Sequence, residues 1–110
     1  MNDLLKNLEY VSPLCSNTLN FLDTLLNDET INQIIVFGSR ALGDYDVYSD
    51  LDLAIDAPLM TKFKWLKLKE YVTYDLNVWI NISLVNYALN PIKLKQRINE
   101  TGVVIYERNK

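Results

Sequence analysis

The sequence predicts a small α/β (α+β) fold, in which a mixed sheet is flanked by helices. Residues 34–37 are Ile-Ile-Val-Phe, an apolar run that is typical of a central strand covered on both faces. Residues 77–85 alternate between apolar and mostly polar positions, so one face of this strand would carry only Val78, Ile80, Ile82 and Leu84. Apolar residues at helical spacing over 13–26 and 62–72 supply the flanking helices.

Length and composition indicate one compact unit. A chain of 110 residues can build one hydrophobic core, so we expect a single domain over residues 1–110. Hydrophobic residues make up 49% and charged residues 23%, as in ordinary globular proteins. No apolar run reaches the roughly 18 residues of a membrane-spanning helix, and Met1–Leu4 lacks the basic start of a signal peptide. We therefore expect a cytoplasmic protein.

The residue types present exclude several kinds of chemistry. The chain has no histidine, which excludes Ser-His and Cys-His nucleophile pairs and histidine-ligated metals. Its single cysteine, Cys15, cannot form an internal disulfide and is interpreted as a small core residue. Any metal should therefore be a hard cation held by oxygen, such as Mg²⁺ or Mn²⁺. The net charge of −3 disfavours nucleic acid as a partner.

The remaining elements follow from caps, glycines and prolines along the chain. In the first half we expect a helix over 3–10 capped by Asn2 or Asp3, a helix from Ser12-Pro13 to Leu26, a strand over 31–37, a short helix over 39–42 ended by Gly43, a loop over 44–48 and a strand over 50–55. In the second half we expect a helix over 62–72 capped by Thr61, the strand over 77–85, a helix over 92–99 ended by Gly102 and a closing strand over 103–106.

Two aspartates form the first half of a candidate site. Asp50 and Asp52 lie two residues apart on a predicted strand, so both carboxylates should project from the same face. Carboxylates this close repel each other unless a proton or a cation lies between them. A divalent cation would relieve the repulsion and could bridge to substrate phosphates.

Gly38-Ser39 forms the second half. Glycine allows a sharp turn and a close approach to a ligand, and the first amides of the following short helix favour an anion. The Ser39 hydroxyl could donate to a phosphate, and Arg40 could pair with a phosphate or hold a carboxylate.

Other conspicuous residues have simpler interpretations. A second D-x-D, Asp44-Tyr45-Asp46, is interpreted as a solvated loop, and Asp56 as an exposed carboxylate. Trp65 and Trp79 are interpreted as core or interface aromatics. The lysines of residues 62–69 are interpreted as a solvated helix face. The aromatics that we expect at the surface, which favour work in a complex with a partner or a second copy, are Tyr45, Tyr48 and Tyr87.

The segments Gly38-Ser39-Arg40-Ala41-x-Gly43 and Ser49-Asp50-x-Asp52-Leu53-Ala54 resemble the minimal nucleotidyltransferase (MNT) family of the DNA polymerase β superfamily. The ending Ile98-x-x-x-Gly102-Val103-Val104-Ile105-Tyr106 also looks like that family's C-terminus. The resemblance covers nearly the whole chain and implies one minimal nucleotidyltransferase domain.

The resemblance also implies an activity. It implies Mg²⁺, a nucleoside triphosphate such as ATP, and in-line transfer of a nucleotidyl group with pyrophosphate leaving. Asp50 and Asp52 match the family's metal-binding catalytic aspartates, and Gly38 and Ser39 match its phosphate-binding pair. Many stand-alone members pair with a helical HEPN-domain toxin as its antitoxin, and some adenylylate that toxin. The implied partner here is therefore a HEPN toxin.

The sequence departs from the family at Ser83, where a third carboxylate is expected on the next strand. Loss of one general base or metal ligand typically costs ~10²–10⁴-fold in rate. The alternative is therefore a catalytically weak or inactive protein that neutralises its partner by contact. Nucleotidylation of a small molecule is a third hypothesis, disfavoured because 110 residues leave no room for a substrate domain.

Overall fold

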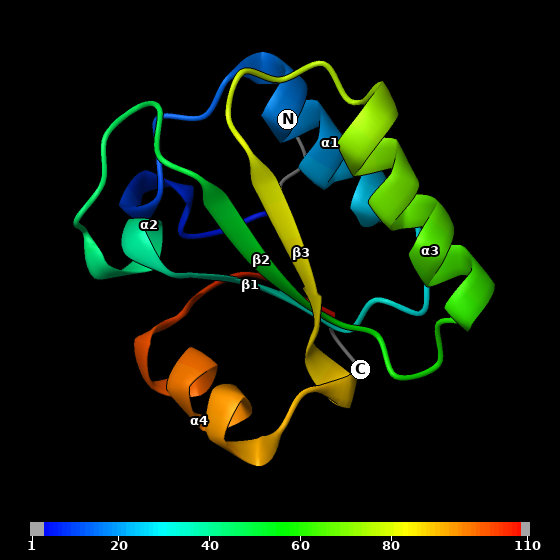
Figure 1. Ribbon diagram of the computed structural model, residues 1–110. Coiled ribbons are helices and arrows are strands. Elements are labelled where there is room, and N and C mark those ends of the chain that lie inside the picture. The colour runs from blue at the N-terminus through cyan, green and yellow to red at the C-terminus, as the bar shows by residue number, and fades with distance from the viewer. Residues whose placement is uncertain (1–3, 109–110) are drawn as a thin grey trace.

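A computed structural model describes residues 4–108 and contains a four-stranded mixed sheet (Figure 1). Its strand order is β3-β2-β1-β4. The strands are β1 (Gln33–Phe37), β2 (Leu51–Asp56), β3 (Ile82–Asn86) and β4 (Val103–Glu107). Strand β1 runs antiparallel to β2 and β4, whereas β2 and β3 are parallel. The predicted mixed sheet with flanking helices is confirmed.

Helices cover both faces of the sheet. Helices α1 (Ser16–Leu25) and α3 (Lys62–Glu70) lie on one face, and α4 (Ile92–Thr101) lies on the other (Figure 1). The one-turn helix α2 (Ser39–Leu42) follows β1 directly. Shorter helical turns are η1 (Leu8–Tyr10), η2 (Tyr71–Asp75, of π type) and η3 (Tyr87–Leu89). Within residues 4–108, no helix combines the length and the hydropathy needed to cross a membrane.

Strand β1 is the centre of two apolar clusters. Ile34 and Val36 are fully buried in the larger cluster, which contains α1 and the apolar side of β2. Ile35, between them, packs on the opposite face with Ala54 and with Ile98 of α4. The burial of β1 on both faces, predicted from its unbroken apolar run, is confirmed.

The N-terminal segment differs from the prediction. The caps expected at Asn2 or Asp3 lie outside the described residues, and only the short turn η1 replaces the helix over 3–10. Asn7 adopts the left-handed conformation at φ 59° and donates its side-chain amide to the carbonyl of Val104. The amide of Lys6 donates to the carbonyl of Ile105. The segment therefore runs beside β4 instead of coiling into a helix.

The third strand is shorter than the predicted 77–85. Strand β3 begins at Ile82 because the pairing with its neighbour β2 begins there, where Ile82 is the partner of Leu51. The carbonyl of Asn81 still accepts a hydrogen bond from the amide of Leu51, but residues 77–80 lie beyond the pairing. There the carbonyl of Asn77 accepts a hydrogen bond from the side chain of Asn17 in α1. The predicted alternation still holds where pairing occurs, with Ile82 and Leu84 buried.

The last two helices are confirmed with altered ends. Helix α3 stops at Glu70 and continues as the π-type turn η2, and its predicted cap is observed as Thr61 Oγ1 accepts from the amide of Lys64. Helix α4 ends before Gly102, as predicted, but that glycine has an ordinary φ. A Cβ at this position would strike the carbonyl oxygen of Ile98 and the side chain of Ile35. Close packing of α4 on β1 therefore explains the glycine.

Candidate active site

The predicted carboxylates meet at the start of β2. Asp52 pairs with Phe37 of β1 on one side and with Ser83 of β3 on the other. Asp50 directly precedes the strand and is exposed, whereas Asp52 is partly buried. Leu51, between them, is fully buried on the core face, as predicted. The pair is therefore held at the sheet end with one carboxylate in solvent and one against the protein.

The charge of one aspartate acts on the other. Burial raises the pKa of Asp52 above its ordinary value, and the nearby charge of Asp50 raises it further. Ionisation of both aspartates is therefore opposed by the desolvation of Asp52 and by the repulsion between the two charges. A positive charge beside these carboxylates would relieve both. Two carboxylates are a donor set that suits a hard divalent cation. Within residues 4–108, no group of three or more acidic, histidine or cysteine side chains is arranged to hold a metal ion.

The turn at Gly38 brings the predicted phosphate-binding pair to the carboxylates. Gly38 has φ +75°, and a Cβ there would collide with the side-chain oxygen Oδ2 of Asp52. Both facts require glycine, because only glycine tolerates this conformation and this approach without strain. The structure therefore brings Gly38 and the following Ser39 next to Asp52. Since α2 has only four residues, it aligns few peptide dipoles.

Arg40 points into the protein. Its guanidinium is fully buried and donates to four main-chain carbonyl groups. The acceptors and donor–acceptor distances are Val11 (2.7 Å), Pro13 (3.1 Å), Val47 (3.2 Å) and Ser49 (3.0 and 3.2 Å). The expected phosphate or carboxylate contact is thus replaced by contacts to carbonyl oxygens, so the Arg40 guanidinium points away from the candidate phosphate site. The expectation was wrong because the accepting carbonyls come from two segments that are distant along the chain, and no local sequence pattern shows that these segments meet at Arg40.

Tyr45 supports the same buried cation. Its ring lies 5.1 Å from the guanidinium carbon of Arg40, and its hydroxyl donates to the carbonyls of Tyr10 and Ser12. The expectation of an exposed Tyr45 is therefore wrong. Asp46 in the same loop is exposed, as predicted, and its carboxylate accepts from the amide of Tyr48.

Ser83 lies beside Asp52 on the neighbouring strand. The two are direct partners in the parallel pairing of β2 and β3, so their side chains share a face about 5 Å apart. Strand β3 contains no acidic residue. The register therefore puts a hydroxyl at the position next to Asp52 where the family resemblance leads one to expect a carboxylate.

A cleft of about 560 Å³ opens beside Gly38 and extends to α4. It is lined on one side by Phe37, Gly38, Ser39, Leu42 and Asp44, and on the other by Leu94, Arg97, Ile98 and Thr101. The contribution of α4 was not predicted, because its residues lie far from Gly38 along the chain. The available indication was the cluster of basic residues at Lys93, Lys95 and Arg97.

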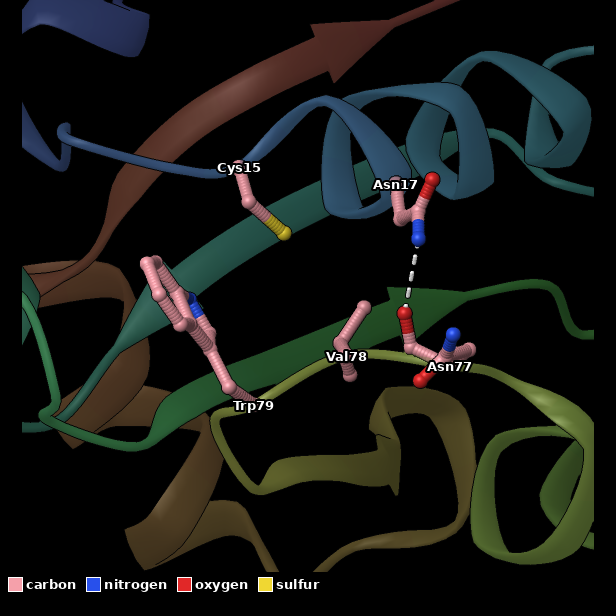
Figure 2. A pocket seen from close by; sticks show the side chains of 5 residues that line it. All are labelled: Cys15, Asn17, Asn77, Val78 and Trp79. Atoms are coloured by element: carbon pink, nitrogen blue, oxygen red, sulfur yellow. Dashed lines mark hydrogen bonds between the residues drawn. The ribbon is translucent and has the colours of Figure 1, made fainter.

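A smaller pocket of about 300 Å³ contains Cys15 (Figure 2). Its sulfur points into the space between the start of α1 and Trp79. Burial acts to raise the pKa of the thiol, but hydrogen bonds from Thr18 and from nearby amides outweigh it and lower the pKa. Cys15 is thus only partly buried, and its interpretation as a core residue is wrong.

The surface aromatics divide into exposed and packed residues. Trp79 and Tyr48 are 66% and 69% exposed and meet edge to face, with ring centroids 5.9 Å apart. Trp65 is partly buried against the larger cluster, as predicted. Tyr87 is partly buried, contrary to expectation, and its hydroxyl donates a hydrogen bond to the side-chain oxygen of Asn99.

The predicted exposure of Asp56 is wrong. This carboxylate, at the far end of β2, is partly buried.

The lysine-rich face of α3 is solvated, as predicted. Lys62, Lys64, Lys67 and Lys69 are all exposed. One of them, Lys64, forms an ion pair of 3.4 Å with Asp28. This face lies on the side of the sheet opposite α4 (Figure 1).

Comparison with known proteins shows the family to which the chain belongs. Residues 20–110 match the family described as Polymerase beta, Nucleotidyltransferase. The chain therefore belongs to this nucleotidyltransferase family, and the family resemblance predicted from residues 38–43 and 49–54 is confirmed. No curated protein matches the chain.

Two solved structures share the fold. One is a toxin–antitoxin with AMP-PNP, with a TM-score of 0.61 and 19% identity over 86% of this chain and 76% of that chain. The other is a mutant of the toxin–antitoxin MntA-HpeT, with a TM-score of 0.63 and 20% identity over 88% of this chain and 76% of that chain. The predicted nucleotidyltransferase fold is confirmed.

The buried cation makes a first prediction. Arg40→Lys should lower the free energy of unfolding by about 3 kcal/mol or more, because lysine cannot reach all four carbonyl groups and leaves buried acceptors without donors. Chemical denaturation measures the loss. The matched control is Arg97→Lys at an exposed position, which should change stability by less than about 0.5 kcal/mol. Equal effects of the two substitutions would contradict the role of Arg40.

The carboxylate pair makes a second prediction. Because the pKa of Asp52 is raised by folding, its stabilising contribution is present at low pH and is lost as the pH rises through the folded-state pKa. In EDTA at pH 7, Asp52→Asn should therefore raise Tm by a few degrees, and the difference should disappear below about pH 4. Asp44→Asn is the control, and a lower Tm for Asp52→Asn at pH 7 would contradict the assignment.

Proposed function

We propose that this protein transfers a nucleotidyl group, AMP from ATP, to a hydroxyl group on a partner protein. The observation that carries the proposal is the close approach of the Gly38 turn to the carboxylate of Asp52, because it would join a turn suited to phosphate to a pair suited to a cation. Membership of the nucleotidyltransferase family supports the reaction class.

Asp50 and Asp52 would hold Mg²⁺ or Mn²⁺. Their oxygens are hard ligands, and their mutual repulsion favours a divalent cation over an empty pair. When bound, such an ion neutralises charge on the triphosphate. Gly38 and Ser39 would bind the phosphates through the main-chain amides and the serine hydroxyl.

The reaction would break a phosphoanhydride bond of the triphosphate and form a phosphoester bond to the acceptor. The acceptor oxygen attacks the α-phosphorus, the bond from that phosphorus to the oxygen bridging to the β-phosphorus breaks, and pyrophosphate leaves with that electron pair. The proton of the acceptor hydroxyl passes to a base. Ser83 is a poor base at neutral pH, so water or Asp52 must accept this proton.

The acceptor would be a toxin of the HEPN type, with this chain as its antitoxin. Two structures of the same fold are described as toxin–antitoxin structures, and one of them was determined with AMP-PNP. These likenesses support a partner protein and a nucleotide for this chain. A second copy of the chain is a further partner to test. Because the substrate is a nucleoside triphosphate, the cytoplasm is the expected location.

The second candidate function is neutralisation of the partner by contact, with weak or absent transfer. The observation that favours it is the pairing of Ser83 with Asp52, since β3 supplies no carboxylate to the site. Fold and nucleotide binding would be retained in this case, while turnover would be lost.

Label transfer tests the first function. The protein is incubated with ATP labelled at the α-phosphate, Mg²⁺ and the product of the neighbouring gene. We expect slow labelling of the partner, accelerated roughly 10²-fold or more by Ser83→Asp, which adds a metal ligand and a base. The matched control Ser16→Asp, at the exposed start of α1, should leave the rate unchanged. Absence of transfer with both the wild type and Ser83→Asp would overturn the proposed function.

A double variant separates the two functions. Asp50→Asn/Asp52→Asn should bind the partner normally but fail to neutralise it if transfer is required. Growth of cells that express the toxin, together with co-purification of the complex, measures both properties. Full neutralisation by this variant would show that contact alone is sufficient.

A further inference from the structure

Arg97 of α4 lines the same cleft as Gly38 and Ser39. We propose that its guanidinium binds the terminal phosphates of the nucleoside triphosphate, the part that leaves as pyrophosphate. This inference rests on the proposed function and names a residue that neither the family motif nor the sequence pattern assigns to the site.

The cleft begins next to the carboxylate pair, although neither Asp50 nor Asp52 lines it. Phe37 pairs with Asp52 across the sheet, Gly38 lies against the Asp52 carboxylate, and both residues line the cleft. A triphosphate whose cation lies at Asp50 and Asp52 therefore reaches the cleft by passing the Gly38 turn. Since the α-phosphorus must stay at the reaction centre, the part that continues past Ser39 is the β- and γ-phosphates.

Arg97 is the cation that the cleft offers to these phosphates. It is the only basic residue in the lining, which otherwise consists of apolar side chains with Gly38, Ser39, Asp44 and Thr101. The ion pairs found within residues 4–108 join Lys6 to Glu107 and Lys64 to Asp28, so the Arg97 guanidinium has no carboxylate partner there. Its planar fork matches two phosphate oxygens, and the neighbouring apolar surface strengthens such a bond.

The backbone of Arg97 is held in a fixed position. The next residue, Ile98, is 1% exposed and packs with Ile35 and Ala54 on the sheet. The end of the helix is held by Gly102, which lies against Ile98 and Ile35. The hydroxyl of Thr101 also donates to the Arg97 carbonyl over 2.8 Å. Only the arginine side chain has to be ordered when the phosphates bind, which keeps the entropic cost low.

Nucleotide titration calorimetry tests the assignment with the full chain in Mg²⁺. Arg97→Ala should weaken ATP binding about 10- to 100-fold, which is the loss of a charge-assisted hydrogen-bond pair, but should change AMP binding less than about threefold. Arg97→Lys should restore part of the ATP affinity because it retains the charge. Lys93→Ala is the matched control, since this exposed cation of the same helix does not line the cleft.

The outcomes separate this inference from the proposed function. Equal loss of ATP and AMP affinity in Arg97→Ala, or unchanged ATP affinity, overturns the role of Arg97 and leaves the transfer reaction standing. If the wild type binds no ATP in Mg²⁺ and labels no partner, both fail together. Retained folding of each variant is checked by circular dichroism, so that lost binding is assigned to the side chain.

Discussion

The structure depends on one buried charge. Arg40 has no exposed surface, and its desolvation is compensated by hydrogen bonds to carbonyl groups from two separate segments, around Val11–Pro13 and Val47–Ser49. Because a buried cation without partners is very costly, these segments must converge on it. The convergence holds the residues before α1 extended, so that the helix starts at Ser16, and it fixes Ser49 immediately before the carboxylate pair. The Arg40 side chain thus connects the segment before α1 to the loop that leads into the carboxylate pair.

The sequence predicted the centre of the molecule well. Three features can be recognised from neighbouring residues alone, and each favours one local structure. They are the unbroken apolar run of β1, the glycines on either side of α2, and the spacing of Asp50 and Asp52. What could not be predicted depends on residues far apart in the chain. The inward direction of Arg40 requires carbonyls from distant segments, and the start of β3 at Ile82 depends on where β2 supplies a partner. The wall of the cleft around Arg97 depends on how α4 packs against β1, which no local pattern encodes.

For the proposed function, the geometry of the site is better suited to binding than to turnover. Gly38, Ser39 and the aspartates suit binding of a cation and phosphates, whereas the position that would assist proton removal is occupied by Ser83. A third carboxylate beside Asp52 would add to a repulsion that already raises the pKa of that residue. The serine therefore leaves the pair with less negative charge to compensate in the absence of a cation.

The strand order has a consequence for how such a protein can change. Ser83 lies on β3, at the edge of the sheet, where its strand has a neighbour in the sheet only on the β2 side. An edge position that is only partly buried accepts a new side chain with little disturbance of the core. One substitution there alters the chemistry next to Asp52 while the core of the fold stays as it is. In an evolving lineage, the chemical character of the position beside Asp52 can therefore change by a single amino-acid replacement without rebuilding the sheet.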